Sequence, residues 1–186
     1  MSTPDSGAGP MPRRTDEYPR TWVVDGANVI GAKADGWWRD RPGAAQRLVT
    51  AISAWIAGSG AGGLAREPAE WPTQVVVVLE GAARAGVPAG IVEIRQPVAG
   101  DSAPPGESAY IPARPVLVVS HAAGHGDDAI VAAARDAGPR TLVVTSDRAL
   151  VARVRALGSD TRGARWLWER VERWAPRVGH TTPTAD

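Results

Sequence analysis

WVVDGANVIG, residues 22–31, opens with an apolar, β-branched run that stops at Asp25, and Asn28 follows before the chain becomes apolar again. An apolar run without polar alternation is typical of a strand that is buried on both faces, as in a parallel sheet. In an open parallel sheet, ligands bind outside the carboxyl ends of the strands. The position of Asp25 therefore predicts a functional site at the end of this strand.

Three further segments share the apolar, β-branched character of residues 21–25. They are QVVVVLE at 74–80, PVLVVS at 115–120 and RTLVVTS at 140–146. Between them, apolar residues recur at helical spacing after Pro42, over 130–134 and over 150–157. Strands and helices in alternation predict an α/β fold with a doubly wound, mainly parallel sheet and right-handed crossovers. IVEIR, residues 91–95, is either a further strand or part of a long insertion.

The two ends of the chain differ from this central part. Residues 1–20 and 176–186 lack apolar runs, which predicts disordered tails around one domain over 21–175. No segment resembles a signal-peptide core or approaches the ~20 apolar residues of a membrane span, so we expect a cytoplasmic protein. The Pro-rich stretch 97–115 is predicted to be an exposed loop, with no role assigned to it.

The composition excludes several kinds of site. The chain has no cysteine, which excludes disulfides, zinc–thiolate sites and thiol catalysis. Its three histidines are too few and too scattered for a zinc site. The formal net charge is +1, and Lys33 is the single lysine among 21 basic residues. This arginine bias suits phosphate recognition, but genome composition explains it equally well.

Acidic residues follow each of the four predicted strands. These residues are Asp25, Glu80, the pair Asp127 and Asp128, and Asp147. All would lie at one edge of a parallel sheet, where carboxylates repel one another unless a cation lies among them. Mg²⁺ and Mn²⁺ prefer such oxygen ligands, and they support phosphodiester displacement. The pattern therefore predicts a Mg²⁺ or Mn²⁺ site for phosphodiester chemistry.

Each acid also has a purely local interpretation. Asp127 and Asp147 lie where helix N-caps or first-turn acids occur. Asp25 and Glu80 each precede a glycine, as turn residues do. The convergence of all these acids at one sheet edge favours the site over the local interpretations.

Aromatic and basic residues lie close to the predicted site. DGWWRDR, residues 35–41, places adjacent tryptophans beside two arginines, a combination that holds single-stranded nucleic acid by stacking and phosphate contact. The alternative is that a tryptophan packs this loop onto the domain. The predicted substrate-binding residues are Trp37, Trp38, Arg39, Arg41, His125, Ser146 and Arg148. His125 is either a proton donor or substrate contact, or an ordinary loop residue.

A helical pattern near the C-terminus has two faces. Leu167, Val171 and Trp174 share one face and are predicted to pack into the core. Trp166 and Arg170, with Arg173, share another face, which either packs against the domain or contacts nucleic acid.

VVDGANVI, GDDAIV and VVTSDRAL follow successive strands in this order. Together they resemble the motifs of the NYN domain, in particular the YacP-like branch of the PIN-like nuclease superfamily, over residues 21–170. The resemblance implies a PIN-like three-layer α/β/α sandwich and an endoribonuclease that cleaves RNA with Mg²⁺ or Mn²⁺. It implies structured or ribosome-associated RNA as the partner, without a membrane, and leaves the oligomeric state open.

The resemblance also implies roles for individual residues. The metal ligands it implies are Asp25, Asp127, Asp128 and Asp147, with the choice between Asp127 and Asp128 left open. Asn28 completes the catalytic set. Glu80 lies where relatives often have an acid, as a further ligand or a supporting residue. Some NYN relatives carry another Asp where Val151 stands here. The alternatives are therefore an RNA-binding module with weak or no catalysis and, ranked lower, a nucleotide phosphohydrolase.

Overall fold

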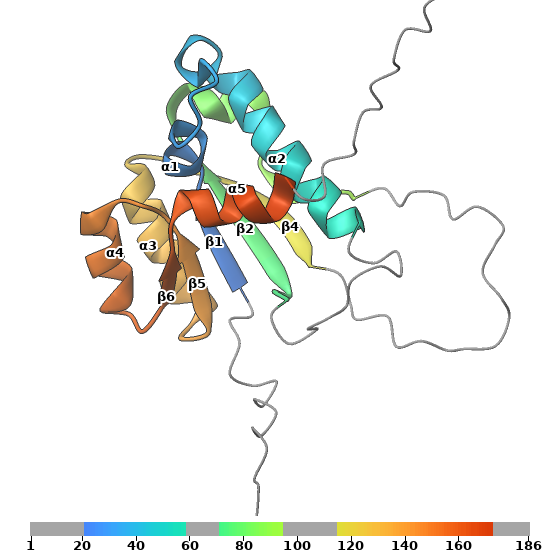
Figure 1. Ribbon diagram of the computed structural model, residues 1–186. Coiled ribbons are helices and arrows are strands. Elements are labelled where there is room, and N and C mark those ends of the chain that lie inside the picture. The colour runs from blue at the N-terminus through green and yellow to red at the C-terminus, as the bar shows by residue number, and fades with distance from the viewer. Residues whose placement is uncertain (1–20, 59–70, 95–114, 173–186) are drawn as a thin grey trace, which may run out of the picture.

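The computed structural model describes residues 21–58, 71–94 and 115–172. The predicted tails at 1–20 and 176–186 lie outside the described residues. So do Arg173, Trp174 and all of the Pro-rich stretch except Pro115. The described residues form an α/β fold in which a six-stranded sheet is flanked by helices (Figure 1).

The first predicted strand, β1 (Thr21–Asp25), lies in the interior of the sheet, whose order is β3-β4-β2-β1-β5-β6. The other strands are β2 (Gln74–Leu79), β3 (Gly90–Val92), β4 (Val116–His121), β5 (Thr141–Val144) and β6 (Asp160–Arg162). All neighbours are parallel except β3, which runs antiparallel to β4. The prediction of a mainly parallel sheet is confirmed, and the start of IVEIR forms its antiparallel edge.

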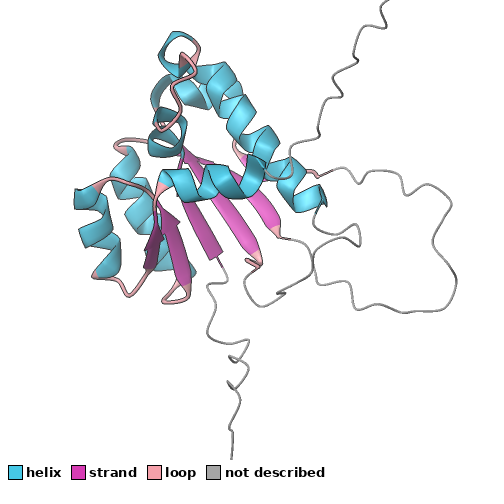
Figure 2. Ribbon diagram, in the orientation of Figure 1, coloured by secondary structure: helices cyan, strands magenta, loops and turns pink. Residues whose placement is uncertain are grey.

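Helices cover both faces of the sheet (Figure 2). One layer consists of α1 (Gly26–Gly31), α2 (Arg41–Gly58) and α5 (Ala164–Glu172), and the other of α3 (Gly126–Ala137) and α4 (Arg148–Arg155). Because side chains alternate along a strand, Trp22 and Val24 of β1 join the first layer and Val23 joins the second. The doubly wound, three-layer prediction is therefore confirmed. No helix in the described ranges has the length and apolar character needed to cross a bilayer.

Four short elements were not predicted from the sequence. Strand β6 has only polar residues, all exposed or half-buried, so it lacks the apolar run that marked the other parallel strands. Helix α1 is only six residues long and follows β1 without a loop. The remaining two are 3₁₀ helices, η2 (Trp37–Arg39) and η4 (Gly81–Gly86). Elements this short leave too few residues for a periodic pattern to show.

A column of stacked tryptophans holds α2 and α5 against the sheet. Trp55 of α2 stacks on Trp22 with ring centroids 5.2 Å apart, and on Trp71 at 4.8 Å. Trp166 of α5 contacts Trp22 at 5.0 Å, and the guanidinium of Arg170 lies over both of these rings. Of the two interpretations of Trp166 and Arg170, the structure shows packing against the domain.

This column should dominate the stability of the domain. Trp55 is 1% exposed, so Trp55→Ala removes a fully buried ring and two stacking partners. We expect it to lower the free energy of unfolding by about 3–5 kcal/mol, measured by denaturant titration. Trp38 is 56% exposed, so Trp38→Ala should change the same quantity by about 0.5 kcal/mol or less. Equal losses in the two variants would contradict this account of the core.

Candidate active site

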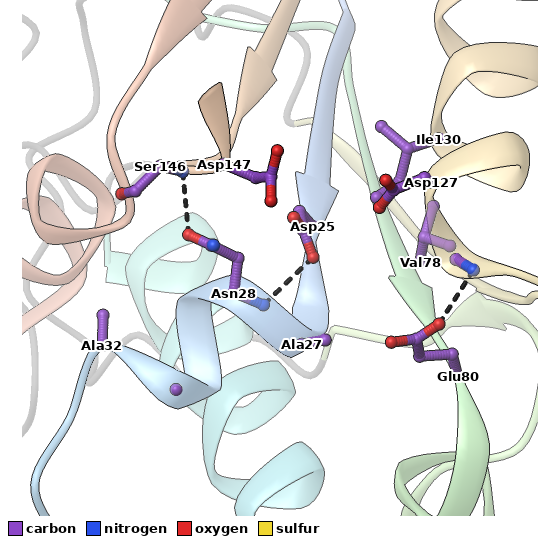
Figure 3. Close-up of a pocket in the computed structure, with 12 residues that line it drawn as sticks. Asp25, Ala27, Asn28, Ala32, Val78, Glu80, Asp127, Ile130, Ser146 and Asp147 are labelled. Atoms are coloured by element: carbon purple, nitrogen blue, oxygen red, sulfur yellow. Dashed lines mark hydrogen bonds between the residues drawn. The ribbon is translucent and has the colours of Figure 1, made fainter. Parts of the chain in front are cut away.

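Four carboxylates line one open pocket of about 490 Å³ at the carboxyl edge of the sheet (Figure 3). Asp25 ends β1, Glu80 follows β2, Asp127 lies in the first turn of α3, and Asp147 precedes α4. In Figure 3, Asp25 lies between Asp147 on one side and Asp127 on the other. We call this cavity the acid pocket. Segments far apart in the sequence meet in it because parallel strands end at one edge.

Asp25 is the buried member of this set, with 6% of its surface exposed. Its Oδ1 accepts a hydrogen bond from the backbone N–H of Asn28 at 3.0 Å, and its Oδ2 accepts one from the hydroxyl of Thr145 at 2.8 Å. Burial raises the pKa of Asp25 above its ordinary value, and the charges of Asp127 and Glu80 raise it further. The two hydrogen bonds lower the pKa, but the net shift is upward. The ionised form is therefore less favourable here than in water, and a nearby cation would offset that cost.

Asp147 both caps a helix and lines the acid pocket. Its Oδ1 accepts from the N–H of Leu150 at 2.9 Å, as expected of an N-cap residue. Its own N–H donates to Thr145 Oγ1 at 3.1 Å. The Thr145 hydroxyl thus joins Asp147 to Asp25. Thr145 was not among the residues predicted from the sequence. Its one signal there is a hydroxyl residue between the apolar strand and the Ser-Asp of VVTSDRAL.

Glu80 is fixed to the start of α3. Its Oε2 accepts the backbone N–H of Gly126 at 2.8 Å, while the side chain of His125, the N-cap residue, makes no capping hydrogen bond. A Cβ at position 126 would lie too close to that oxygen, so the Glu80 carboxylate would have to move and the contact in its present form depends on glycine. The capping carboxylate of α3 therefore comes from a different strand, which a local pattern in the sequence cannot reveal.

The paired acids of α3 lie in different surroundings. Asp127 lines the acid pocket, whereas Asp128 is exposed and is not among the lining residues. Arg153 of α4 hydrogen-bonds Asp128 at 2.5 Å and lies 3.9 Å from Asp127. The hydrogen bond and the charge of Arg153 lower the pKa of Asp128. Only Asp127 of the two acids therefore lines the pocket, because consecutive residues of a helix point in different directions and Arg153 pairs with Asp128 outside it. Metal binding by either acid stays a prediction.

Asn28 and Ser146 connect the acid pocket to the surrounding elements. Asn28 Oδ1 accepts the N–H of Ser146 at 2.8 Å, and Ser146 Oγ accepts the N–H of Ala164, the first residue of α5, at 3.0 Å. Both residues line the pocket. The predicted catalytic amide therefore also fixes the loop between β5 and α4.

The remaining predicted substrate-binding residues surround the site unevenly. Trp37 is half-buried and packs against the core, while Trp38 is 56% exposed, so one ring of the pair points in and the other out. Trp37, Arg41 and His125 line a second pocket beside the acid pocket. Trp38, Arg39 and Arg148 line neither pocket, and all three are exposed.

The donor chemistry of the acid pocket suits a hard divalent cation. Its charged ligands are all carboxylates, the kind that Mg²⁺ and Mn²⁺ prefer. In residues 21–58, 71–94 and 115–172, no group of three or more metal-binding side chains lies close enough to hold one ion. Mg²⁺ commonly takes one or two carboxylates and keeps several waters, and the pocket offers that number around Asp25.

Comparison with known proteins gives a likeness at the level of fold. No family model matches the chain, and no curated protein matches it. Among solved structures, the chain is similar to the crystal structure of a mutant of Rae1 (YacP) from Bacillus subtilis, with 18% sequence identity and a TM-score of 0.46. The match covers 82% of this chain and 75% of that chain.

The raised pKa of Asp25 predicts how the stability of the metal-free protein depends on pH. A carboxyl group whose pKa is higher in the folded state stabilises the fold most below its ordinary pKa, here 3.8, and this contribution is lost as the pH rises through the raised value. Asp25→Asn keeps an oxygen for the Asn28 N–H and carries no charge. We therefore expect the variant to be more stable than wild type at neutral pH in EDTA.

That advantage should shrink as the pH falls toward about 4, which thermal unfolding at a series of pH values will measure. Asp136→Asn, at an exposed acid at the opposite end of α3, controls for the loss of one negative charge. An Asp25→Asn effect of constant size at every pH would contradict the burial account.

Proposed function

We propose that this protein is a Mg²⁺- or Mn²⁺-dependent endoribonuclease that hydrolyses RNA phosphodiester bonds at the acid pocket. The observation that carries the proposal is the set of four carboxylates from separate segments around one cavity, with the buried Asp25 in their midst. A buried carboxylate with acidic neighbours favours a bound cation. The motifs of the sequence that resemble NYN nucleases contain Asp25, Asp127 and Asp147, which support the same reaction.

Asp25, together with Asp127 or Asp147, would hold the metal directly, and the remaining carboxylates of the pocket, including Glu80, would bind its waters. When bound, the ion would activate a water and offset the negative charge that develops on the phosphate. Asp25 and Asp147 are already oriented by their hydrogen bonds to the backbone and to Thr145. Such preorganisation avoids reordering these ligands during the reaction.

The amide of Asn28 is placed to contact substrate. Its Oδ1 is taken by the N–H of Ser146, which leaves the Nδ2 group as the donor on the pocket side. An N–H donor suits a phosphate oxygen. Three exposed arginines, Arg39, Arg41 and Arg148, form no ion pair with another described residue, and their charge suits a polyanion.

A second candidate function is RNA binding without appreciable catalysis. The absence of a closely grouped set of three metal ligands among the described residues favours it, as does Val151 in place of an acid. Val151 is half-buried and does not line the acid pocket.

A cleavage assay separates these candidates. Wild-type protein should cut single-stranded RNA internally with Mn²⁺ and stop in EDTA. Asp25→Asn should lower kcat on the order of a hundredfold or more, because a metal contributes several kcal/mol to such reactions. Asp136→Asn should retain wild-type rates. Cleavage that survives both EDTA and Asp25→Asn would exclude the metal mechanism. RNA binding without cleavage would select the binding module. Hydrolysis of free nucleotides with RNA left intact would select a phosphohydrolase.

Metal binding can be measured without any reaction. If Mn²⁺ binds only the folded protein, it should stabilise wild type by about 2.7 kcal/mol at a hundredfold excess over Kd. Asp127→Asn and Asp128→Asn form a matched pair, since both change an acid of α3 beside Arg153 but only Asp127 lines the pocket. Thermal unfolding should show a reduced Mn²⁺ effect in the first variant and the full effect in the second. The reverse result would place the site elsewhere.

A further inference from the structure

A second cavity of about 420 Å³ adjoins the acid pocket. Ala27 and Glu80 line both cavities, so the two share a boundary. Trp37, Arg41, Gly124 and His125 form much of the remaining wall. We call this cavity the aromatic pocket. Its volume lies in the range of about 300–1,000 Å³ that is usual for sites of small organic groups.

Two flat side chains face this cavity. The Trp37 ring packs against the core, and the Arg41 guanidinium lies 5.5 Å from the centroid of that ring. The loop before Trp37 is held by Gly36, whose φ of 80° favours glycine, and by a hydrogen bond from the Trp37 N–H to Asp35. Aromatic rings and arginine planes are the surfaces on which proteins stack unpaired bases. Here the fold fixes such a surface before any ligand arrives.

The boundary between the cavities also offers a hydrogen-bond acceptor. Glu80 uses Oε2 for the Gly126 N–H, and Oε1 makes no hydrogen bond to a described residue. His125, at the start of α3, adds a ring that can donate or accept. Arg41 forms no ion pair with another described residue. The cavity therefore combines a stacking wall, edge-directed polar groups and an available positive charge.

We propose that the aromatic pocket receives one unpaired nucleobase, next to the phosphate that occupies the acid pocket. This inference rests on the proposed function, since the acid pocket defines which phosphate is adjacent. A base can enter such a cavity only after leaving its partner in a duplex. The substrate is then a single strand or a loop, and the contact with one base fixes the cleavage position relative to it.

Cleavage of oligonucleotides with one abasic position tests the proposal. In a single-stranded RNA of about ten nucleotides, a missing base at one fixed place beside the cut should lower kcat/KM on the order of tenfold, and a missing base elsewhere should matter less. Duplex RNA of the same sequence should be cut more slowly. Equal rates at every abasic position would overturn the base pocket and leave the nuclease proposal standing.

Single-residue variants distinguish a role of the aromatic pocket in base binding from a general loss of stability. Trp37→Leu and Arg41→Ala should each reduce the difference between intact and abasic substrates. Two control variants should keep the difference. Trp71→Leu changes a half-buried tryptophan just before the start of β2, and Arg135→Ala changes an exposed arginine near the end of α3. Arg41 is exposed, so its variant keeps the test valid if Trp37→Leu unfolds. A full difference retained in Arg41→Ala would count against the pocket.

Binding in EDTA tests the pocket when no cleavage occurs. The probes are adenosine monophosphate and ribose 5-phosphate, and their dissociation constants are measured by titration with tryptophan fluorescence as the signal. Adenosine monophosphate should bind on the order of tenfold more tightly. Arg41→Ala should lose this preference and Arg135→Ala should retain it. Base preference without RNA cleavage would support the pocket and refute the nuclease. No base preference in either assay would refute the pocket.

Discussion

Asp25 ends β1 inside the protein, and each oxygen of its carboxylate accepts a hydrogen bond from a different part of the chain. The bond from Asn28 starts α1 immediately after the strand, so the chain turns at the pocket instead of running past it. The bond from Thr145 ties the end of β5 to the end of β1. A buried acid is costly to ionise, and the charges of Asp127 and Glu80 increase that cost. The neighbouring elements thus meet at a carboxylate with which no described cationic side chain forms an ion pair.

The local and functional interpretations of the acids are compatible. Asp25 caps α1, Asp147 caps α4, and Glu80, at the end of the neighbouring strand β2, binds the first backbone N–H of α3. Each of these helices therefore begins at the acid pocket, with the positive end of its dipole toward the cavity. Capping orients the carboxylates, and the helix ends partly offset their charge. A residue can stabilise a helix and serve a site with the same side chain.

The buried parallel strands could be predicted from sequence because burial on both faces leaves a continuous apolar run. The edge of the sheet could not be predicted in the same way, since β6 has no buried side chain and pairs on one side only. Asp127 and Asp128 are neighbours in sequence, and only the rotation of α3 and the position of Arg153 decide which one lines the pocket. Thr145 and the Gly126 contact likewise depend on residues that only tertiary structure brings together. The sequence therefore indicated that the acids lie at the carboxyl ends of the strands, whereas packing decided which of them line the pocket.

The bond between Thr145 and Asp25 spans 120 residues, and that between Trp168 and the carbonyl of Val29 spans 139. During synthesis the N-terminal part of a chain emerges and begins to fold first. Here β1 and α1 emerge early, yet they lack their partners until β5 and α5 have been made. The pocket is therefore incomplete until β5 has been made, and a chain truncated before Thr145 would carry the first motif without the partner that Asp25 has here. A nascent chain can therefore assemble the pocket only after β5 has emerged and paired with β1.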